Sequence, residues 1–119
     1  MTTYTPYTQK AFTATAAALG AGIRVKLNTS GQILVAGATD SAIGTTLQAI
    51  AASGDGLVQL FGPSRLVVAG AAIARAALLY PLASGKVDDT GTTAIGLVAA
   101  EAATADGDII EAFDARTGA

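Results

Sequence analysis

Several residue types that carry chemistry are missing from the sequence. It has no cysteine, so neither a disulfide framework nor a thiolate metal site can form. It has no histidine, which removes the most common general base, the most common metal ligand and every Ser–His or Cys–His nucleophile pair. Tryptophan is absent, and charged residues make up only 13% of the 119 residues. We therefore expect a protein that is not an enzyme and that binds no metal or cofactor.

The charges that remain are scattered singly along the chain. Seven basic and nine acidic residues give a net charge of −2, and no basic cluster occurs. Such a chain offers no surface for a nucleic-acid backbone or an anionic membrane. The most apolar stretch, residues 66–83, contains Gly70, Arg75 and Pro81, which argues against a membrane-spanning helix. Residues 1–7 lack the charged and apolar regions of a secretory signal.

Pairs of carboxylates were considered as acid–base or calcium sites. Asp88 and Asp89 are adjacent, so on a strand they point to opposite faces. Asp106 and Asp108 flank Gly107 in a turn, but calcium requires about six to eight oxygen ligands and no calcium-loop spacing surrounds them. We interpret Asp106 and Asp108 as solvated turn acids.

The pattern from residue 22 onward is typical of β-strands. Between residues 23 and 27, apolar and charged residues alternate, which predicts a strand with Arg24 and Lys26 on its solvent face. The turn-forming residues 28–31 and a second apolar run at 32–36 complete a predicted β-hairpin. Further strands are predicted, separated by turns rich in Gly, Ser and Asp, at residues 43–50, 57–61, 65–69, 78–82, 95–101 and 108–113, with a short one at Val87 and a turn at 62–64.

Alanine-rich stretches at 13–19, 71–77 and 97–105 favour helix by propensity, but the glycines around them argue against long helices. We expect at most one short helix or helical turn, within residues 71–77.

The chain also repeats itself. Ala42-Ile43-Gly44 recurs 52 residues later as residues 94–96, and Ser30-Gly31-Gln32-Ile33 matches residues 84–87 at a spacing of 54. Two similar halves, about 18–61 and 70–113, predict an all-β fold: a small β-barrel or β-sandwich in a single domain over residues 18–119. Chance similarity between hairpins of biased composition is the alternative explanation.

Residues 1–17 differ from the rest, being rich in threonine and without a sustained period. We predict an extended N-terminal arm, with Tyr4, Pro6, Tyr7 and Phe12 as candidate anchors on a partner or a neighbouring subunit, because aromatic residues are favoured at interfaces. The alternatives are a frayed terminus and a Phe12 that covers the domain's own core.

The second half contains a series of motifs in a fixed order: Leu66–Ile73, Leu78-Leu79-Tyr80, Ser84–Val87, Thr93–Val98 and Glu101–Glu111. With these motifs it resembles a family of small decoration (cement) proteins that stabilise the heads of tailed phages. The resemblance covers about residues 18–113, more loosely in the first half, and Arg75-Ala76 departs from it where similar sequences tend to carry a glycine and an acidic residue.

This resemblance implies a structural, non-enzymatic protein of the virion that is made in the host cytoplasm. It implies binding of the major capsid protein on the outer surface of the capsid, and a homotrimer. The alternatives are a tail or fibre accessory, or another non-catalytic β binding module of the carbohydrate-binding or carrier type. Lys86 follows Ser84-Gly85 at a turn, as the modified lysine of carrier modules does, but it lacks the neighbouring residues of those families.

Overall fold

A computed structural model of the chain describes residues 9–60 and 64–114, and in these ranges it consists of β-strands and loops without a helix. The predicted all-β class is confirmed. The strands are β1 (Gln9–Thr13), β2 (Arg24–Leu27), β3 (Ile33–Val35), β4 (Gly44–Thr46), β5 (Asp55–Gln59), β6 (Ser64–Val68), β7 (Tyr80–Pro81), β8 (Val87–Asp88), β9 (Leu97–Ala99) and β10 (Ile109–Asp114).

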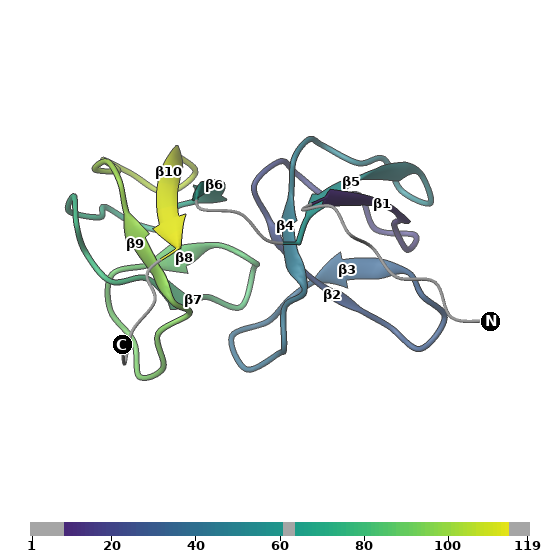
Figure 1. The fold of residues 1–119 in the computed structure, drawn as a ribbon, viewed down its shortest axis with the longest axis horizontal. Coiled ribbons are helices and arrows are strands. Elements are labelled where there is room, and N and C mark those ends of the chain that lie inside the picture. Colours follow the sequence, from purple (N-terminus) through teal and green to yellow (C-terminus); the bar gives the residue numbers. More distant parts are fainter. Residues whose placement is uncertain (1–8, 61–63, 115–119) are drawn as a thin grey trace.

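The strands form two lobes, which Figure 1 shows side by side. The first lobe is a five-stranded sheet in the order β1-β5-β4-β2-β3. The second lobe contains the three-stranded sheet β6-β10-β9 and the two-stranded sheet β7-β8. All these strand pairs are antiparallel, and the described strands form open sheets rather than a closed barrel.

Each lobe has its own hydrophobic core. The first core gathers Leu19, Val25, Ile33, Ile50 and Val58 with their neighbours. The second core is built from the inward side chains of β6, β9 and β10 and from the loops that close over them, including Val67, Ile73, Leu79, Val87 and Ile110. Both cores are built mainly from Val, Ile, Leu and Ala, and none of the described aromatic residues, Phe12, Tyr80 and Phe113, is fully buried.

The two lobes share one backbone hydrogen-bonding frame. The first and last strands of each lobe pair with each other, β1 with β5 and β6 with β10. Isolated bridges recur at matching positions: Ala14 with Ile33 and Ala69 with Val87, then Leu19 with Ile50 and Ile73 with Ala103. Each structural unit therefore starts one strand earlier than the sequence repeats at 18–61 and 70–113.

The N-terminal arm predicted over residues 1–17 falls into two parts. Residues 1–8 lie outside the described residues. Residues 9–13 form β1, whose register pairs Gln9 with Gln59 and Thr13 with Asp55, and Ala14 is completely buried in the first core. This part of the chain belongs to the sheet, and the threonine-rich sequence hid it because it lacks an apolar alternation.

Of the other local predictions, one is confirmed and others differ from the structure. The hairpin of residues 23–36 is confirmed as β2 and β3. The strand expected over 43–50 is only three residues long, because the chain turns away after Thr46. Residues 71–77 form no helix: Ile73 instead exchanges two backbone hydrogen bonds with Ala103. In the turn predicted at 62–64, residues 62 and 63 lie outside the described residues and Ser64 begins β6.

The turn around Ala76 has a strained backbone conformation at a position that the two lobes share. Ala76 has φ +70°, a left-handed conformation that suits glycine, and the matching residue of the first lobe is Gly22 with φ +74°. The two are equivalent because Gly22 N donates to Thr46 O and Ala76 N donates to Ala99 O. The departure at Arg75-Ala76 noted in the sequence is therefore an alanine in a position shaped for glycine.

Replacing this alanine is expected to stabilise the protein. Ala76→Gly should raise the free energy of unfolding by about 1 kcal/mol, because glycine adopts positive φ without a steric cost. The measurement is urea denaturation followed by circular dichroism. Ala74→Gly is the matched control: it lies in the same turn without positive φ, and should lower stability. An Ala76→Gly variant less stable than the wild type would contradict this explanation.

Candidate functional site

The lobes are joined at a glycine turn. Gly85, in the β7–β8 turn of the second lobe, accepts a hydrogen bond from the backbone N–H of Arg24 on β2 at 3.1 Å. Gly85 has φ +77°, and a Cβ there would stand 2.7 Å from Ile23 Cγ2 and 3.1 Å from Arg24 O. Only glycine allows this close approach of the two lobes.

The junction buries Arg24. The alternation along β2 predicted a solvent-facing side chain, but Arg24 is only 5% exposed, so that prediction is wrong. Its side of the sheet is covered by the second lobe, which no local pattern in the sequence reveals. Lys26, two residues further on, stays partly accessible as predicted.

A cavity of about 350 Å³ lies between the lobes beside this arginine. It is mixed in character, with apolar walls and four ionisable groups. The first lobe contributes Arg24, Asp40, Ala42, Ile43, Gly44, Thr45 and Leu60, and the second contributes Arg65, Ile95, Leu97 and Asp114. Arg24 also lines a neighbouring cavity of about 550 Å³ that runs along Tyr80–Leu82 and Thr90–Thr93.

The two arginines of the smaller cavity are incompletely paired. Arg24 Nη1 and Arg65 Nε are buried and have no hydrogen-bond acceptor among the described residues. Burial lowers the pKa of both guanidinium groups, while the charge of Asp40 raises that of Arg24 and the charge of Asp114 raises that of Arg65. Both arginines remain cations at neutral pH, with Arg24 almost fully buried and Arg65 partly buried.

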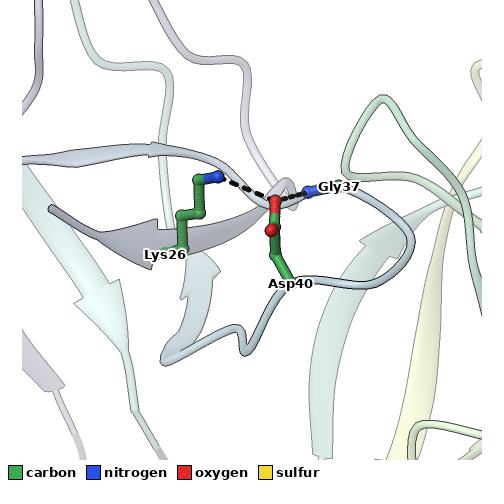
Figure 2. A network of polar contacts seen from close by, with 3 residues as sticks. All are labelled: Lys26, Gly37 and Asp40. Carbon is green, nitrogen blue, oxygen red and sulfur yellow. Dashed lines mark hydrogen bonds and ion pairs between the residues drawn. The ribbon is translucent and has the colours of Figure 1, made fainter.

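One wall of the cavity is fixed by a polar clamp, shown in Figure 2. Asp40 Oδ2 accepts hydrogen bonds from Lys26 Nζ at 2.8 Å and from the backbone N–H of Gly37 at 2.7 Å. These two bonds, together with the nearby charges of Lys26 and Arg24, hold the pKa of Asp40 below its ordinary value. The clamp ties residues 37–40 back onto β2 and so orients Asp40 at the cavity.

The outer face of the second lobe is unusually apolar for a solvent-facing sheet. Leu66, Ile109, Phe113 and Leu78 are all large exposed hydrophobic residues, with Ile109 51% and Phe113 50% accessible. They share one face because Ile109, Glu111 and Phe113 alternate along β10 on that side. Glu111 lies opposite Leu66, and Phe113 lies opposite Val98, which in turn bridges Leu78. We call Leu66, Leu78, Val98, Ile109 and Phe113 the apolar face.

The equivalent face of the first lobe is more polar, although Leu57 is exposed on it in the place of Glu111. The common frame matches Ile109 with Asp55, Phe113 with Gln59, Val98 with Thr45 and Leu78 with Arg24. Two sheets with one backbone thus carry different side chains, and the second gathers more exposed large apolar residues, which lie around the exposed Glu111. Since large apolar patches on soluble proteins mark interaction sites, this face is the candidate interface.

The predicted anchors are placed only in part. Tyr4, Pro6 and Tyr7 lie outside the described residues. Phe12 is on β1, half-buried against the first core, with Lys10 Nζ 6.0 Å from the centre of its ring. The sequence reasoning missed the apolar face, although the run of Ile109, Glu111 and Phe113 on alternate positions of one strand was visible.

The acidic residues weighed as metal ligands are engaged in structural contacts. Asp106 pairs with Lys86 at 2.8 Å, which also occupies the lysine considered as a carrier site. Asp108 accepts hydrogen bonds from the backbone and hydroxyl of Thr104 and from Ala105 N, which lower its pKa. Within residues 9–60 and 64–114 no group of three candidate ligands could hold a metal ion. The same ranges contain no helix long and apolar enough to cross a membrane.

Comparison with known proteins finds a likeness of fold. No protein-family model matches the chain. No curated protein matches it either. Among solved structures, the crystal structure of the head fiber gp8.5 N base in bacteriophage phi29 superposes with a TM-score of 0.72. The likeness covers 90% of this chain and 94% of that one at 16% sequence identity. The whole two-lobed architecture is therefore shared with the base of a phage head fibre.

The clamp at Asp40 predicts a dependence of stability on pH. Asp40→Asn should destabilise the protein at pH 7, because the amide loses the ionic pairing with Lys26. The pKa of Asp40 is lowered from 3.8, so its contribution is complete above that value and is lost as the pH falls through the lower pKa of the folded state.

The difference between wild type and Asp40→Asn, measured by urea denaturation from pH 7 down to pH 3, should therefore shrink on acidification. Asp89→Asn is the control, because within the described residues the Asp89 side chain accepts no hydrogen bond; only its backbone N–H is engaged, donating to Asp88 Oδ1. A gap that stays constant with pH would show that the charge of Asp40 plays no part.

Proposed function

We propose that this chain is a non-catalytic structural protein that attaches to the outer surface of a tailed-phage head and stabilises the assembled shell. The observation that carries the proposal is the fold: a protein described as the base of a head fibre has the same two-lobed architecture over nearly its entire length. The resemblance of residues 18–113 to capsid decoration proteins points in the same direction.

The apolar face supplies the attachment surface in this proposal. Covering Leu66, Ile109 and Phe113 with a partner removes apolar area from water, which is the dominant favourable term in protein association. A protein that binds the assembled lattice and not its separate subunits stabilises the lattice by its own binding free energy. The major capsid protein is the partner that this role requires.

The repeated architecture also supports self-association. The turn at Gly85 docks on residue 24 of the first lobe. The equivalent turn of the first lobe, at Gly31, is free of such a contact: no atom lies within 4 Å of the position that a Cβ would occupy there. The equivalent of residue 24 in the second lobe is the exposed Leu78. A second copy can therefore dock its Gly31 turn at Leu78, and a head-to-tail contact of this kind forms a ring when its rotation closes. Together with the trimer that the resemblance to decoration proteins implies, this contact leads us to propose a homotrimer.

A fibre component is the second candidate function. The specific observation that favours it is that the superposed structure is itself the base of a head fibre. The number of copies per virion separates a head role, with hundreds of copies, from a tail role, with a dozen or fewer. A cryo-EM map of the assembled particle separates a decoration lying on the shell from a component of a projecting head fibre.

The head-to-tail contact predicts an effect on oligomeric state. Leu78→Asp should shift the protein from trimer to monomer in sedimentation velocity, because it places a charge in the centre of the docked surface. Leu57→Asp is the matched control, an equally exposed leucine on the first lobe that should leave the trimer intact. A monomeric wild type, or a Leu78→Asp variant that sediments as the wild type does, would remove the proposed contact.

The apolar face predicts an effect on head attachment. The double variant Ile109→Ser/Phe113→Ser should bind preformed heads at least about tenfold more weakly in a pelleting assay, since two exposed apolar side chains lose their burial. The control Leu27→Ser removes an exposed leucine from the first lobe and should bind normally. Unchanged binding by the double variant would exclude this face, and a chain lacking residues 1–8 tests the anchors Tyr4, Pro6 and Tyr7 separately.

A further inference from the structure

We propose that the protein surface covering the apolar face carries a basic side chain, a lysine or an arginine, among apolar ones, and that Glu111 pairs with this cation. The inference rests on the proposed attachment of the apolar face to the capsid shell. It names the chemistry that the shell offers at the point of attachment.

Glu111 lies in the middle of the apolar face. On β10 it stands between Ile109 and Phe113 on the exposed side of the strand, and across the sheet it lies opposite Leu66. All three of these neighbours are large, exposed apolar side chains. A partner that covers all three therefore covers the carboxylate of Glu111 as well.

The carboxylate of Glu111 is unpaired in the described part of the chain. Residues 9–60 and 64–114 contain two ion pairs, and Glu111 belongs to neither. Its backbone N–H donates to Glu101 Oε1 at 2.9 Å, which holds a second exposed carboxylate beside it. Water solvates these charges while the face is open. Because a charge that is buried without a partner is costly, the covering surface has to supply a group that pairs with Glu111.

The strand pairing does not require an acid at this position. The equivalent residue of the first lobe is Leu57, which is exposed and lies opposite Ala11 of β1 as Glu111 lies opposite Leu66 of β6. Glutamate is also disfavoured in β-strands. The acid is therefore a property of this surface, and it is available for recognition.

The charge of the second lobe favours a cation over a neutral donor. Its described residues, 64–114, include three basic and seven acidic residues, whereas residues 9–60 include three basic and two acidic ones. The second lobe thus carries an excess of negative charge, which attracts basic groups and repels acidic ones. Arginine is also enriched at the centres of protein interfaces, where it combines a charge with an apolar stem.

Attachment to preformed heads tests the inference. Glu111→Gln keeps the size of the side chain and removes its charge, and it should bind heads at least about tenfold more weakly in a pelleting assay. Glu111→Lys reverses the charge and should bind more weakly still. Asp89→Asn is the matched control, because it removes one negative charge outside the apolar face and should bind as the wild type does. Urea denaturation checks that each variant is folded.

A chromatographic probe tests the face on the purified chain, without heads. The probe is agarose that bears hexyl stems ending in an ammonium group, which combine an apolar surface with a cation. Glu111→Gln should elute from it at a lower salt concentration than Asp89→Asn, although both variants have lost one negative charge. On a hydrophilic anion exchanger, which responds to the charge of the whole protein, the two variants should elute together.

The two measurements separate this inference from the proposed function. If the wild type binds heads, the head assay decides: equal or tighter binding by Glu111→Gln overturns the inference, leaves the attachment intact and shows that Glu111 only keeps the face soluble. If the wild type does not bind heads, the proposed attachment is wrong and the ammonium resin decides. Elution of Glu111→Gln together with Asp89→Asn then overturns the inference, and its earlier elution supports a face that recognises a basic side chain.

Discussion

The hydrogen bond between Arg24 N and Gly85 O is the contact on which the arrangement of the two lobes depends. It brings the backbone of one lobe against the backbone of the other, at a distance that a side chain at residue 85 would prevent. This approach buries Arg24 and covers one sheet of the first lobe. It also forms the wall of the cavity that both lobes share. A change at Gly85 would therefore act on lobe packing, on the environment of Arg24 and on the cavity together.

The sequence predicted the features that depend on local pattern. Alternation over residues 23–27 and the turn that follows yielded the first hairpin, and the recurring Ala-Ile-Gly and Ser-Gly motifs indicated a duplicated unit. It failed where tertiary packing decides. β1 carries no apolar alternation and is a strand because β5 offers it a partner. Arg24 sits on the face that a local reading assigns to solvent, and only the position of the second lobe buries it.

The candidate sites, too, depend partly on local sequence pattern and partly on tertiary packing. Aromatic scarcity directed attention to Tyr4, Pro6, Tyr7 and Phe12, of which the described residues include only Phe12, half-buried against the first core. The apolar face requires the pairing of β6, β10 and β9, which places Leu66, Phe113 and Val98 together although they are distant in sequence. Equivalent positions in the two lobes keep the same backbone pairing. Their exposed side chains differ, so the pairing does not determine those side chains. The frame is shared, and the side chains on the two outer faces differ.

The pairing of the first strand of each lobe with the last has a consequence for biosynthesis. Because β1 pairs with β5, the N-terminal lobe cannot close until Gln59 has left the ribosome, and it can then close while the second lobe is still being translated. The second lobe closes only when β10 is complete, at the end of the described chain. The pairing of the strands thus allows the nascent protein to complete its lobes one after the other.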